Sequence, residues 1–543
     1  MKADVKAAQP PVGREPVSRA GWRILTLVCA AQAMSLLDRQ ILSILARDIK
    51  ADLHIGDAEL GLLYGTVFAL FYALFSLPLG RLADGWVRTR LLAICIAVWS
   101  FSTLMAAFAS GFALLALSRL GVGIGEAASG PTGNSLVFDV FPKNRRGFAM
   151  GAVAIAIALG LGLSMMLGGL AADWWNHAFT GARPLGLAGW QFAFVVAALP
   201  GFILVALLLR EREPTRGGQD GIATRQDPAP FRASLALFAA VAPVSHWIML
   251  YRRRAPPRSW IANLAALATI LAVGIALVLL AERLSPRPPI AFGPVALSAH
   301  VLQWSVVGFG AFVIVNLFQS LKLADRPAHA AICSPTLLLL MGTGALQYAI
   351  NYGVMGFTPS FLMRTYGLSA RETGLHFGLL SAGLGMLGPL LAGPLADRAN
   401  RHLPGAGRIG LTLVSLGLSP LLAIWTYTAP DASGFYWRFT LYSLVLTMWM
   451  PPLYAMLYDL VLPRMRGVTS STFVMISTLS GLGIGPYAVG MISDANGGDL
   501  ASAILSVNLV APVIVVLLVL AMLHVKRDEA SLITRCRAAG EEI

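Results

Sequence analysis

The sequence predicts an all-α membrane protein with fourteen transmembrane helices, and three observations lead to that fold class. Of the 543 residues, 57% are hydrophobic and 13% are charged, and the mean hydropathy is +0.70, whereas a soluble domain is about 25% charged. The apolar residues form runs of about 20, enough to cross a hydrocarbon core ~30 Å thick. Lys and Arg gather in alternate connections, so we attribute the net charge of +14 to membrane topology rather than to nucleic-acid binding.

A first block of six apolar segments follows a polar, basic stretch, residues 1–23, which we expect to be a cytoplasmic tail. Basic residues lie in the even-numbered connections of this block, on the side of the N-terminus, and the positive-inside rule assigns that side to the cytoplasm. We expect both termini to be cytoplasmic and the protein to lie in a bacterial inner membrane. The expected spans are Ile24–Ala46, Leu60–Leu82, Leu91–Ala109, Phe112–Phe138, Phe148–Ala171 and Trp190–Leu209.

A middle segment, residues 211–335, separates this block from a second one. It begins with a stretch rich in Gly, Pro, Asp and Arg, Glu211–Pro230, which is typical of a flexible linker. Two uncharged runs, Ile261–Ala281 and Val301–Leu321, are long enough to be spans. The apolar segment Phe231–Tyr251 is interrupted by charge and proline, so we expect an interfacial helix. A third crossing there is the alternative, but it would invert the second block.

The second block again contains six apolar segments, within residues 336–524, and a basic tail, 525–543, follows it. The chain therefore divides into a tail (1–23), an N-terminal six-helix bundle (24–210), a linker with two extra transmembrane helices (211–335), a C-terminal six-helix bundle (336–524) and a second tail. The expected spans are Leu337–Phe361, Leu375–Leu395, Ile409–Tyr427, Phe439–Leu460, Thr469–Ile492 and Ala503–His524.

The two blocks repeat each other. The motif Gly-x-Leu-Ala-Asp leaves the second span of each block, at positions 80–84 and 393–397. A second motif, from an Asp to a Gly eight residues later, occurs at 139–147 and again at 459–467. The offsets between the copies are similar, 313 residues (80 to 393) and 320 residues (139 to 459). Parallel repeats of this kind build the two halves of some secondary transporters.

Charged residues inside two spans are the main functional candidates. Arg119 and Glu126 are seven residues apart in the fourth span, so they lie on one side of the helix, and Asp38 and Arg39 lie in the first span. Counting residues from the helix ends places Asp38, Arg39 and Arg119 at a common depth of ~12–13 Å, with Glu126 at ~22 Å. A charge at the helix centre costs about 2.5–3.5 kcal/mol or more, so such charges usually face a protein interior or a water-filled path.

We interpret these four residues as a proton-coupling site. Burial and a nearby cation shift the pKa of a carboxylate in opposite directions, so a group between those influences can exchange protons near neutral pH. Our hypothesis is that Asp38 and Glu126 alternate as partners of Arg119, and that protonation biases the carrier between two states. The structural alternative is a static ion pair between Asp38 and Arg119, with Arg39 bound to backbone carbonyls.

These motifs resemble the major facilitator superfamily. The stretch from Gly80 to Arg88 is similar to its loop signature between spans two and three, and Arg119-x-x-x-Gly123 is similar to its span-four signature. More narrowly, the stretches around Asp38-Arg39, Arg119–Glu126 and Asp139–Gly147 resemble the Spinster-type lipid transporters and their bacterial relatives. The resemblance implies two six-helix bundles, alternating access, and coupling of proton to substrate movement at the charged positions. The two inserted spans lie outside it and are similar to the 14-span arrangement of other members.

The same resemblance implies a conformational latch at the cytoplasmic ends of the repeated spans. The charge of Asp84 can meet arginines and a helix N-terminus there, and Asp397 would mirror it in the second block. The alternative is ordinary solvation of a loop. The latch residues that we expect are Gly80, Asp84, Arg88, Asp139, Arg146, Asp397, Asp459 and Arg466.

The expected substrate pocket is mostly apolar and aromatic, with a few polar groups. Such a lining suits a large amphipathic ligand whose polar head lies near the buried charges. The alternative for each aromatic residue is packing against its neighbours or lipid. The expected pocket residues are Arg119, Glu126, Gln347, Asn351, Tyr352, Tyr442, Trp449 and Tyr454.

We therefore expect a secondary active transporter, proton-coupled, that moves an amphipathic small molecule or a lysolipid-like substrate. One alternative is a proton-coupled drug or organic-anion transporter of the same superfamily, and another is a receptor or scaffold without transport. The spans contain no clustered His, Cys, Asp or Glu with ligand spacing and no nucleophile with a base, so we expect no enzyme activity, no cofactor and no metal. The expected partners are the substrate, protons and membrane lipids, without nucleic acid, and the expected state is monomeric.

Overall fold

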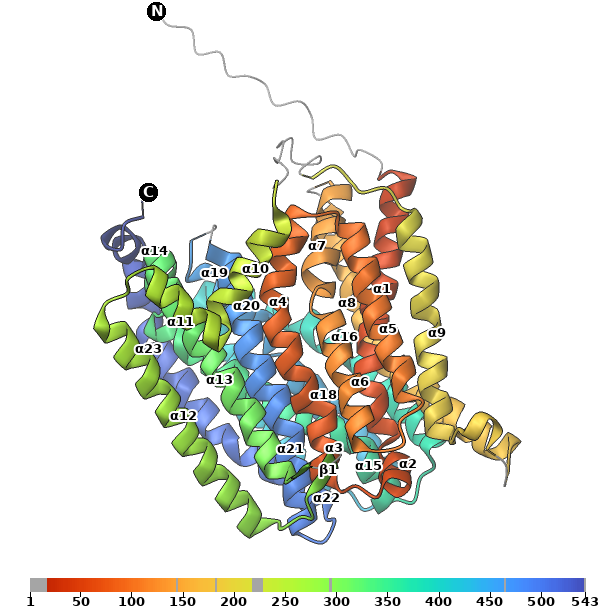
Figure 1. Cartoon of the computed structure of the whole chain (residues 1–543). Helices are drawn as coiled ribbons and strands as arrows, with labels where there is room; N and C mark the ends of the chain where they lie inside the picture. Colours follow the sequence, from red (N-terminus) through yellow and green to blue (C-terminus); the bar gives the residue numbers. More distant parts are fainter. Residues whose placement is uncertain are drawn as a thin grey trace, which may run out of the picture.

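The computed structural model describes residues 17–142, 145–180, 183–216, 228–292, 295–462 and 465–541. Among these residues, fourteen helices are long and apolar enough to cross a membrane, the number that the sequence predicts. Figure 1 shows that the first described helix begins, and the last described helix ends, at the same end of the helical bundle, which we call the terminus end. We call the opposite end, where α2, α3, β1 and α22 lie, the far end.

The N-terminal bundle contains six spans, two of them interrupted. The fourth span breaks at Ala127 and Ala128, since Pro131 at the start of the next helix has no N–H to donate to the preceding turn. A π-helical turn, Leu62–Thr66, interrupts the second span. A short helix, α2 (Ala46–Leu53), lies at the far end. The spans are α1 (Arg19–Ile44), α3 with η1 and α4 (Asp57–Gly85), α5 (Arg88–Ala106), α6 (Phe112–Glu126) with α7 (Ser129–Val140), α8 (Arg146–Ala178) and α9 (Gly189–Arg210).

The C-terminal bundle repeats this plan. Its fourth span breaks before Pro451 and Pro452, and its fifth contains a π-helical turn, Thr478–Leu482. The last helix continues beyond the expected span, and Asp528 accepts a hydrogen bond of 2.8 Å from the Thr336 N–H at the start of α15. The spans are α15 (Pro335–Thr365), α16 (Ala370–His402), α17 (Gly407–Tyr427), α18 (Ala432–Thr447) with α19 (Met450–Asp459), α20 (Arg466–Ser477) with η6 and α21 (Gly483–Ala495), and α22 (Leu500–Val507) with η7 and α23 (Ala511–Ala538).

The insert between the bundles begins with two short helices at the terminus end, α10 (Pro230–Val241) and α11 (Pro243–Arg252), bent by 98° relative to each other. Neither is long enough to cross a membrane alone. The two expected spans follow as α12 (Pro257–Leu284) and α13 (Ala299–Ala324), joined by a hairpin of β1 (Ile290–Phe292) and β2 (Val295–Leu297). A short helix, α14 (Arg326–Ile332), leads into the C-terminal bundle. Figure 1 shows α12 along the edge of the molecule, with α13 between it and the bundles.

The two bundles meet along two helix pairs. Helix α8 packs on α16, and the second span packs on α21. The first pair approaches so closely that a Cβ at Gly162 would lie 2.5 Å from the Gly378 carbonyl oxygen, so glycine is required there.

Candidate transport site

All four charged residues predicted as the coupling site lie together in the N-terminal bundle, between α1 and α6. Glu126 is 1% exposed, and its Oε2 accepts hydrogen bonds from Arg39 Nη2 at 2.7 Å and from Ser35 Oγ at 2.8 Å. The sequence-based hypothesis makes Glu126 a partner of Arg119, but the ion pair in the structure joins Glu126 to Arg39. A buried carboxylate with a charged donor and a hydroxyl donor is the arrangement that makes such burial tolerable.

Arg119 and Asp38 also lie side by side, but not as an ion pair of side chains. Arg119 Nη2 donates to the backbone carbonyl of Asp38 at 2.9 Å. The Asp38 side chain is fully buried, and neither of its carboxylate oxygens has a hydrogen-bond partner among the described residues; the same holds for Arg119 Nη1 and Glu126 Oε1. Each unsatisfied buried polar group costs about 1–3 kcal/mol. The site therefore retains capacity for further protons or polar ligand atoms.

Two aromatic residues of α4, which the sequence analysis did not single out, complete the surroundings of Arg39. The guanidinium carbon of Arg39 lies 4.6 Å from the ring centre of Phe68 and 5.1 Å from that of Tyr72. Cation–π contacts of this kind are worth about 0.5–2 kcal/mol and hold the guanidinium in place. The signal was available in the sequence as two aromatic residues four positions apart, on one face of the second span.

A cavity of about 300 Å³ gives access to this cluster. Its polar lining includes Ser35, Arg39, Tyr72 and Glu126. The lining then continues to Asn134 of α7 and to Met150, Val153 and Ala154 near the start of α8, which are nearer the terminus end of those helices. Arg39 and Glu126 therefore face a cavity that extends toward the terminus end, whereas Asp38 and Arg119 do not line it.

The residues expected to form the substrate wall of the C-terminal bundle do not all face the cluster. Tyr352 lies close enough to Arg39 for an electrostatic interaction. Its ring stacks on Tyr348 at 5.7 Å. Gln347 is fully buried, and its Nε2 donates to Asn351 Oδ1 at 2.8 Å. These residues lie on α15, the counterpart of α1.

The remaining three predicted wall residues differ in burial. Trp449 is 1% exposed and contacts the edge of Tyr348 at 5.3 Å, and Tyr454 is half-buried. Tyr442 is fully buried in an aromatic cluster with Tyr427 and Phe439. The alternative of aromatic packing thus describes Tyr442, whereas Tyr352 and Tyr454 are only half-buried. Tyr348, which the sequence analysis did not select, joins them.

At the terminus end of the N-terminal bundle, Arg88 organises the predicted latch residues. Its guanidinium is 1% exposed, forms an ion pair with Asp139, and binds Glu213 at 2.7 Å. Asp84 is exposed, and Arg216 donates to its backbone carbonyl and to that of Ala83. The loop is therefore held mainly through its backbone. Gly80 lies within α4, and Arg146 donates to the carbonyls of Phe138 and Phe141.

The C-terminal bundle has an equivalent network, centred on a residue that the sequence analysis missed. Arg408, at the start of α17, binds Asp397 at 2.9 Å and pairs with Asp459. Arg408 begins the third span of its block just as Arg88 begins the third span of the first, and this position was the available signal. Arg466 begins α20 and is exposed.

A third network joins the bundles at the far end. The Asp57 carboxylate, 1% exposed, accepts hydrogen bonds from both terminal nitrogens of Arg364, at 2.7 and 2.9 Å, and pairs with Lys50. Asp494 of α21 accepts from the backbone N–H groups of Asp57 and Ala58 at the start of α3. A carboxylate at a helix N-terminus is stabilised by the orphan N–H groups there. The two bundles are thus closed against each other at the far end.

The insert participates in this closure. Arg287, between α12 and β1, binds Glu59 at 3.1 Å and pairs with Asp494. Deeper in the seam, Gln303 of α13 donates to the Gly483 carbonyl at 2.7 Å, and the Thr66 hydroxyl donates to the same carbonyl at 2.6 Å. Thr66 also bonds to Gln303. Helix α13 is therefore tied to one span of each bundle.

Two repeated six-helix bundles, closed at one end and with buried charges accessible from the other, define a membrane transporter. The chain belongs to the Major Facilitator Superfamily, whose family model matches residues 28–346. Alternating access, in which the two bundles open in turn to opposite sides, is general in this superfamily. The family places the chain among transporters rather than enzymes.

The sequences of individual relatives agree with this superfamily, and a solved structure confirms the predicted fold. An MFS-type efflux pump of Mycolicibacterium smegmatis is 26% identical over 488 residues, covering 89% of this chain and 87% of that protein. Human protein spinster homolog 1 is 26% identical over 477 residues, covering 87% of this chain and 72% of that protein. The crystal structure of a bacterial homolog of the human lysosomal transporter Spinster, inward-facing and unoccupied, has a TM-score of 0.63 at 22% identity and covers 96% of this chain and 99% of that one. The chain is thus similar to Spinster proteins and, at the same identity, to an MFS-type efflux pump of the superfamily.

Proposed function

We propose that this transporter is proton-coupled and moves an amphipathic small molecule or a lysolipid-like substrate. The observation that carries the proposal is the buried cluster of Asp38, Arg39, Arg119 and Glu126, of which Arg39 and Glu126 line a cavity. Oε1 of Glu126 has no partner among the described residues, and a proton there would remove the negative charge that holds the Arg39 guanidinium 2.7 Å from Oε2. Release of Arg39 toward Tyr352 of the other bundle would link protonation to the relative position of the bundles.

The experiment is pH-dependent flux in proteoliposomes with Asp38→Asn and Glu126→Gln. Each variant keeps the size of the side chain and removes the exchangeable proton, so we expect flux that no longer responds to a pH gradient. Asp173→Asn, in the far-end portion of α8 where Asp173 pairs with His177, is the matched control and should keep the pH response. Wild-type pH dependence in both cluster variants would overturn proton coupling.

The proposal of a lysolipid-like substrate is supported by the aromatic residues of the C-terminal bundle near the charged cluster. Charged groups of α1 and α6 face one side, and the tyrosines Tyr348, Tyr352 and Tyr454 lie on the other, which suits a polar head and an apolar tail. A fluorescent lysophospholipid should be carried, and Tyr454→Ala should raise its KM with little change in kcat. A carrier that excludes lysophospholipids but exports cationic dyes would instead be a drug transporter. The relation to the efflux pump of Mycolicibacterium smegmatis favours that second candidate.

We further propose that the terminus end is cytoplasmic, because the basic connections of the first block lie there. An impermeant thiol reagent added to intact cells should label Thr428→Cys, at the far end of α17, and not His402→Cys, at the terminus end of α16. The opposite labelling pattern would invert the topology. The Arg88 and Arg408 networks would then be reassigned from the cytoplasmic latch to the opposite side.

A further inference from the structure

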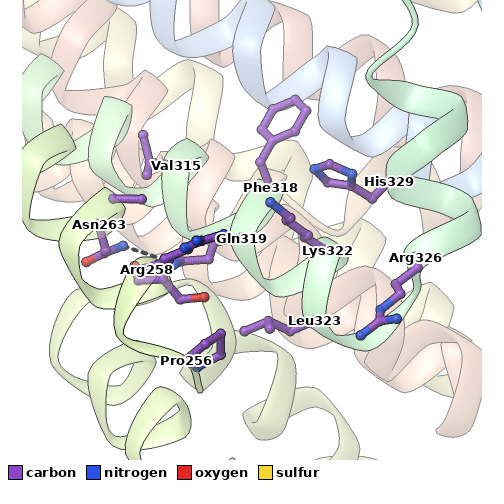
Figure 2. Close-up of a pocket in the computed structure, with 12 residues that line it drawn as sticks. Pro256, Arg258, Asn263, Val315, Phe318, Gln319, Lys322, Leu323, Arg326 and His329 are labelled. Carbon is purple, nitrogen blue, oxygen red and sulfur yellow. Dashed lines mark hydrogen bonds between the residues drawn. The ribbon is translucent and has the colours of Figure 1, made fainter.

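The insert contains a basic cavity that the transport site does not use. It has a volume of about 650 Å³ and lies at the terminus end, between α12, α13 and α14 (Figure 2). Three cationic side chains line it: Arg258 at the start of α12, Lys322 near the end of α13 and Arg326 at the start of α14. None of the three forms an ion pair or hydrogen bond with another residue in the part of the chain that the structure describes.

The nearby polar residues do not neutralise these cations. Asp325 lies beside Arg326, but its carboxylate accepts the Ala328 N–H at 3.0 Å and caps α14. His329 lines the same cavity near Lys322 (Figure 2), and burial together with the charge of Lys322 lowers the pKa of His329. The cavity therefore carries three positive charges that have no partner among the described residues.

The floor and walls of the cavity are suited to a group that is polar at one end. Asn263 is 1% exposed and donates to Gln319 and Asn316 at 2.8 Å, so the polar floor is ordered by its own hydrogen bonds. Phe318 and Leu323 provide apolar walls next to the cations. Figure 2 shows Phe318 and Lys322 projecting from α13 on the same side as His329.

A second, apolar cavity of about 550 Å³ lies between the same two helices, deeper in the membrane. Its lining on α13 runs from Val301 to Phe312, and that of the basic cavity from Val315 to Leu323, with lining residues that recur three or four positions apart. Such spacing places both linings on one face of the helix. At 1.5 Å per residue the apolar part is roughly 16 Å long, close to half the hydrocarbon core. The two cavities thus follow the order of a headgroup and an acyl chain.

The position of α12 makes a ligand between these helices physically useful. Only 6% of its apolar stretch is buried within the protein, so α12 is held to the bundles chiefly through α13. At Gly274, in the apolar cavity, an added Cβ would meet no atom within 4 Å. The contact between α12 and α13 is therefore incomplete without an occupant.

We propose that one anionic phospholipid binds between α12 and α13, with its phosphate at Arg258, Lys322 and Arg326 and an acyl chain along the apolar cavity. Basic pockets between transmembrane helices at the membrane interface are suited to anionic headgroups. The lipid fastens α12 to α13, and α13 in turn contacts both bundles through Gln303 and Thr66. This site is separate from the substrate route and does not depend on which substrate is carried.

The test is lipid binding by the purified full-length protein, titrated with phosphatidylglycerol or phosphatidylcholine and read by native mass spectrometry and thermal unfolding. The wild type should retain phosphatidylglycerol and gain thermal stability from it, and should gain less from phosphatidylcholine. The variant Arg258→Gln/Lys322→Gln/Arg326→Gln should bind phosphatidylglycerol on the order of 100-fold more weakly. The control Arg252→Gln/Arg253→Gln/Arg254→Gln removes the same charge from the neighbouring loop and should bind normally.

A second variant tests the acyl-chain half without changing charge. Gly274→Leu fills the apolar cavity where nothing else contacts the backbone, and it should reduce retained phosphatidylglycerol while leaving the fold intact. Equal loss of binding in the two triple variants would overturn the proposal in favour of general surface electrostatics. Stabilisation by inorganic phosphate equal to that by phosphatidylglycerol would overturn it in favour of a free anion site. Unchanged binding in Gly274→Leu would remove the acyl chain from the site.

Discussion

The two bundles share a plan of helices but differ in what fills their interiors. The N-terminal bundle places four ionisable side chains between its first and fourth spans, with Glu126 held by Arg39. The C-terminal bundle has Gln347, Tyr348 and Tyr352 on the equivalent first span, and no ion pair joins its interior spans among the described residues. Buried charges weaken a structure unless they are paired, so their confinement to one bundle indicates a division of tasks. The N-terminal bundle contains the interior charges, and the interior of the C-terminal bundle contains amide and aromatic side chains instead.

The terminus-end networks show the same asymmetry in a milder form. Arg88 is buried, with 1% of its side chain exposed, and binds two carboxylates and the Ser135 hydroxyl. Arg408 also binds two carboxylates, but it is 20% exposed, and Asp397 and Asp459 are 60% and 46% exposed. The ion pairs at equivalent positions in the repeat therefore contribute different amounts to the free energy of unfolding, because solvent screens the Arg408 network.

The largest expected effect compares matched truncations in the two interiors. Glu126→Ala leaves Arg39 buried without its counter-ion and should lower the free energy of unfolding by about 3–5 kcal/mol. Gln347→Ala removes one amide hydrogen bond and should cost about 1 kcal/mol. Denaturant unfolding of the detergent-solubilised proteins measures both. An equal decrease in the free energy of unfolding in the two variants would show that the interior charges stabilise the protein no more than an amide hydrogen bond does.

The next effect compares the two terminus-end arginines. Arg88→Ala should cost about 3 kcal/mol, because Asp139 and Glu213 are left facing each other in a partly buried site. Arg408→Ala should cost about 1 kcal/mol, since its carboxylates are already solvated. The same unfolding measurement applies, and raising the salt concentration should reduce only the Arg408 effect. A larger loss from Arg408→Ala would reverse the comparison.

A third prediction concerns the contact that joins the bundles. Arg364→Ala removes a bidentate partner of Asp57 and should shift the equilibrium toward far-end opening by about 1–2 kcal/mol, roughly a tenfold change in population. Lys50 and Ser493 still contact Asp57, which limits the effect. Distances between spin labels on α2 and α22 report the opening. Arg371→Ala, a nearby surface arginine at the start of α16, serves as the control and should leave the distances unchanged.

The sequence predicted the spans and the interior charges for the same reason, since apolar length and a charge within it are local signals. Asp38, Arg39, Arg119 and Glu126 were identified in this way, but their pairing was not. Arg39 reaches Glu126 across two helices whose relative rotation is set by packing. The position of α1 depends on contacts such as Ala33 against Gly160 of α8, which no single segment encodes.

The far-end network was missed for a different physical reason. Asp57 and Arg364 are 307 residues apart, and Asp57 and Asp494 are 437 residues apart, at the ends of helices where charged residues are common. Their residue types therefore give no local signal, and only the approach of the two bundles makes them partners. The insert is similar, because Arg287 and Gln303 acquire their partners from the fold.

The smallest expected effect tests whether the insert links the two bundles. Gln303→Leu removes hydrogen bonds from α13 to Thr66 and to the Gly483 carbonyl, and interhelical hydrogen bonds in membranes average about 0.6 kcal/mol, so the loss should be about 1 kcal/mol. Gln319→Leu is the matched control, because Gln319 bonds within the insert, to the Ser259 carbonyl and His246. Both variants should unfold at similar denaturant concentrations, but only Gln303→Leu should change the rate of far-end opening between spin labels on α2 and α22. An identical opening rate in the two variants would mean that α13 accompanies the bundles without restraining them, and the difference between the bundles would then lie in their interiors alone.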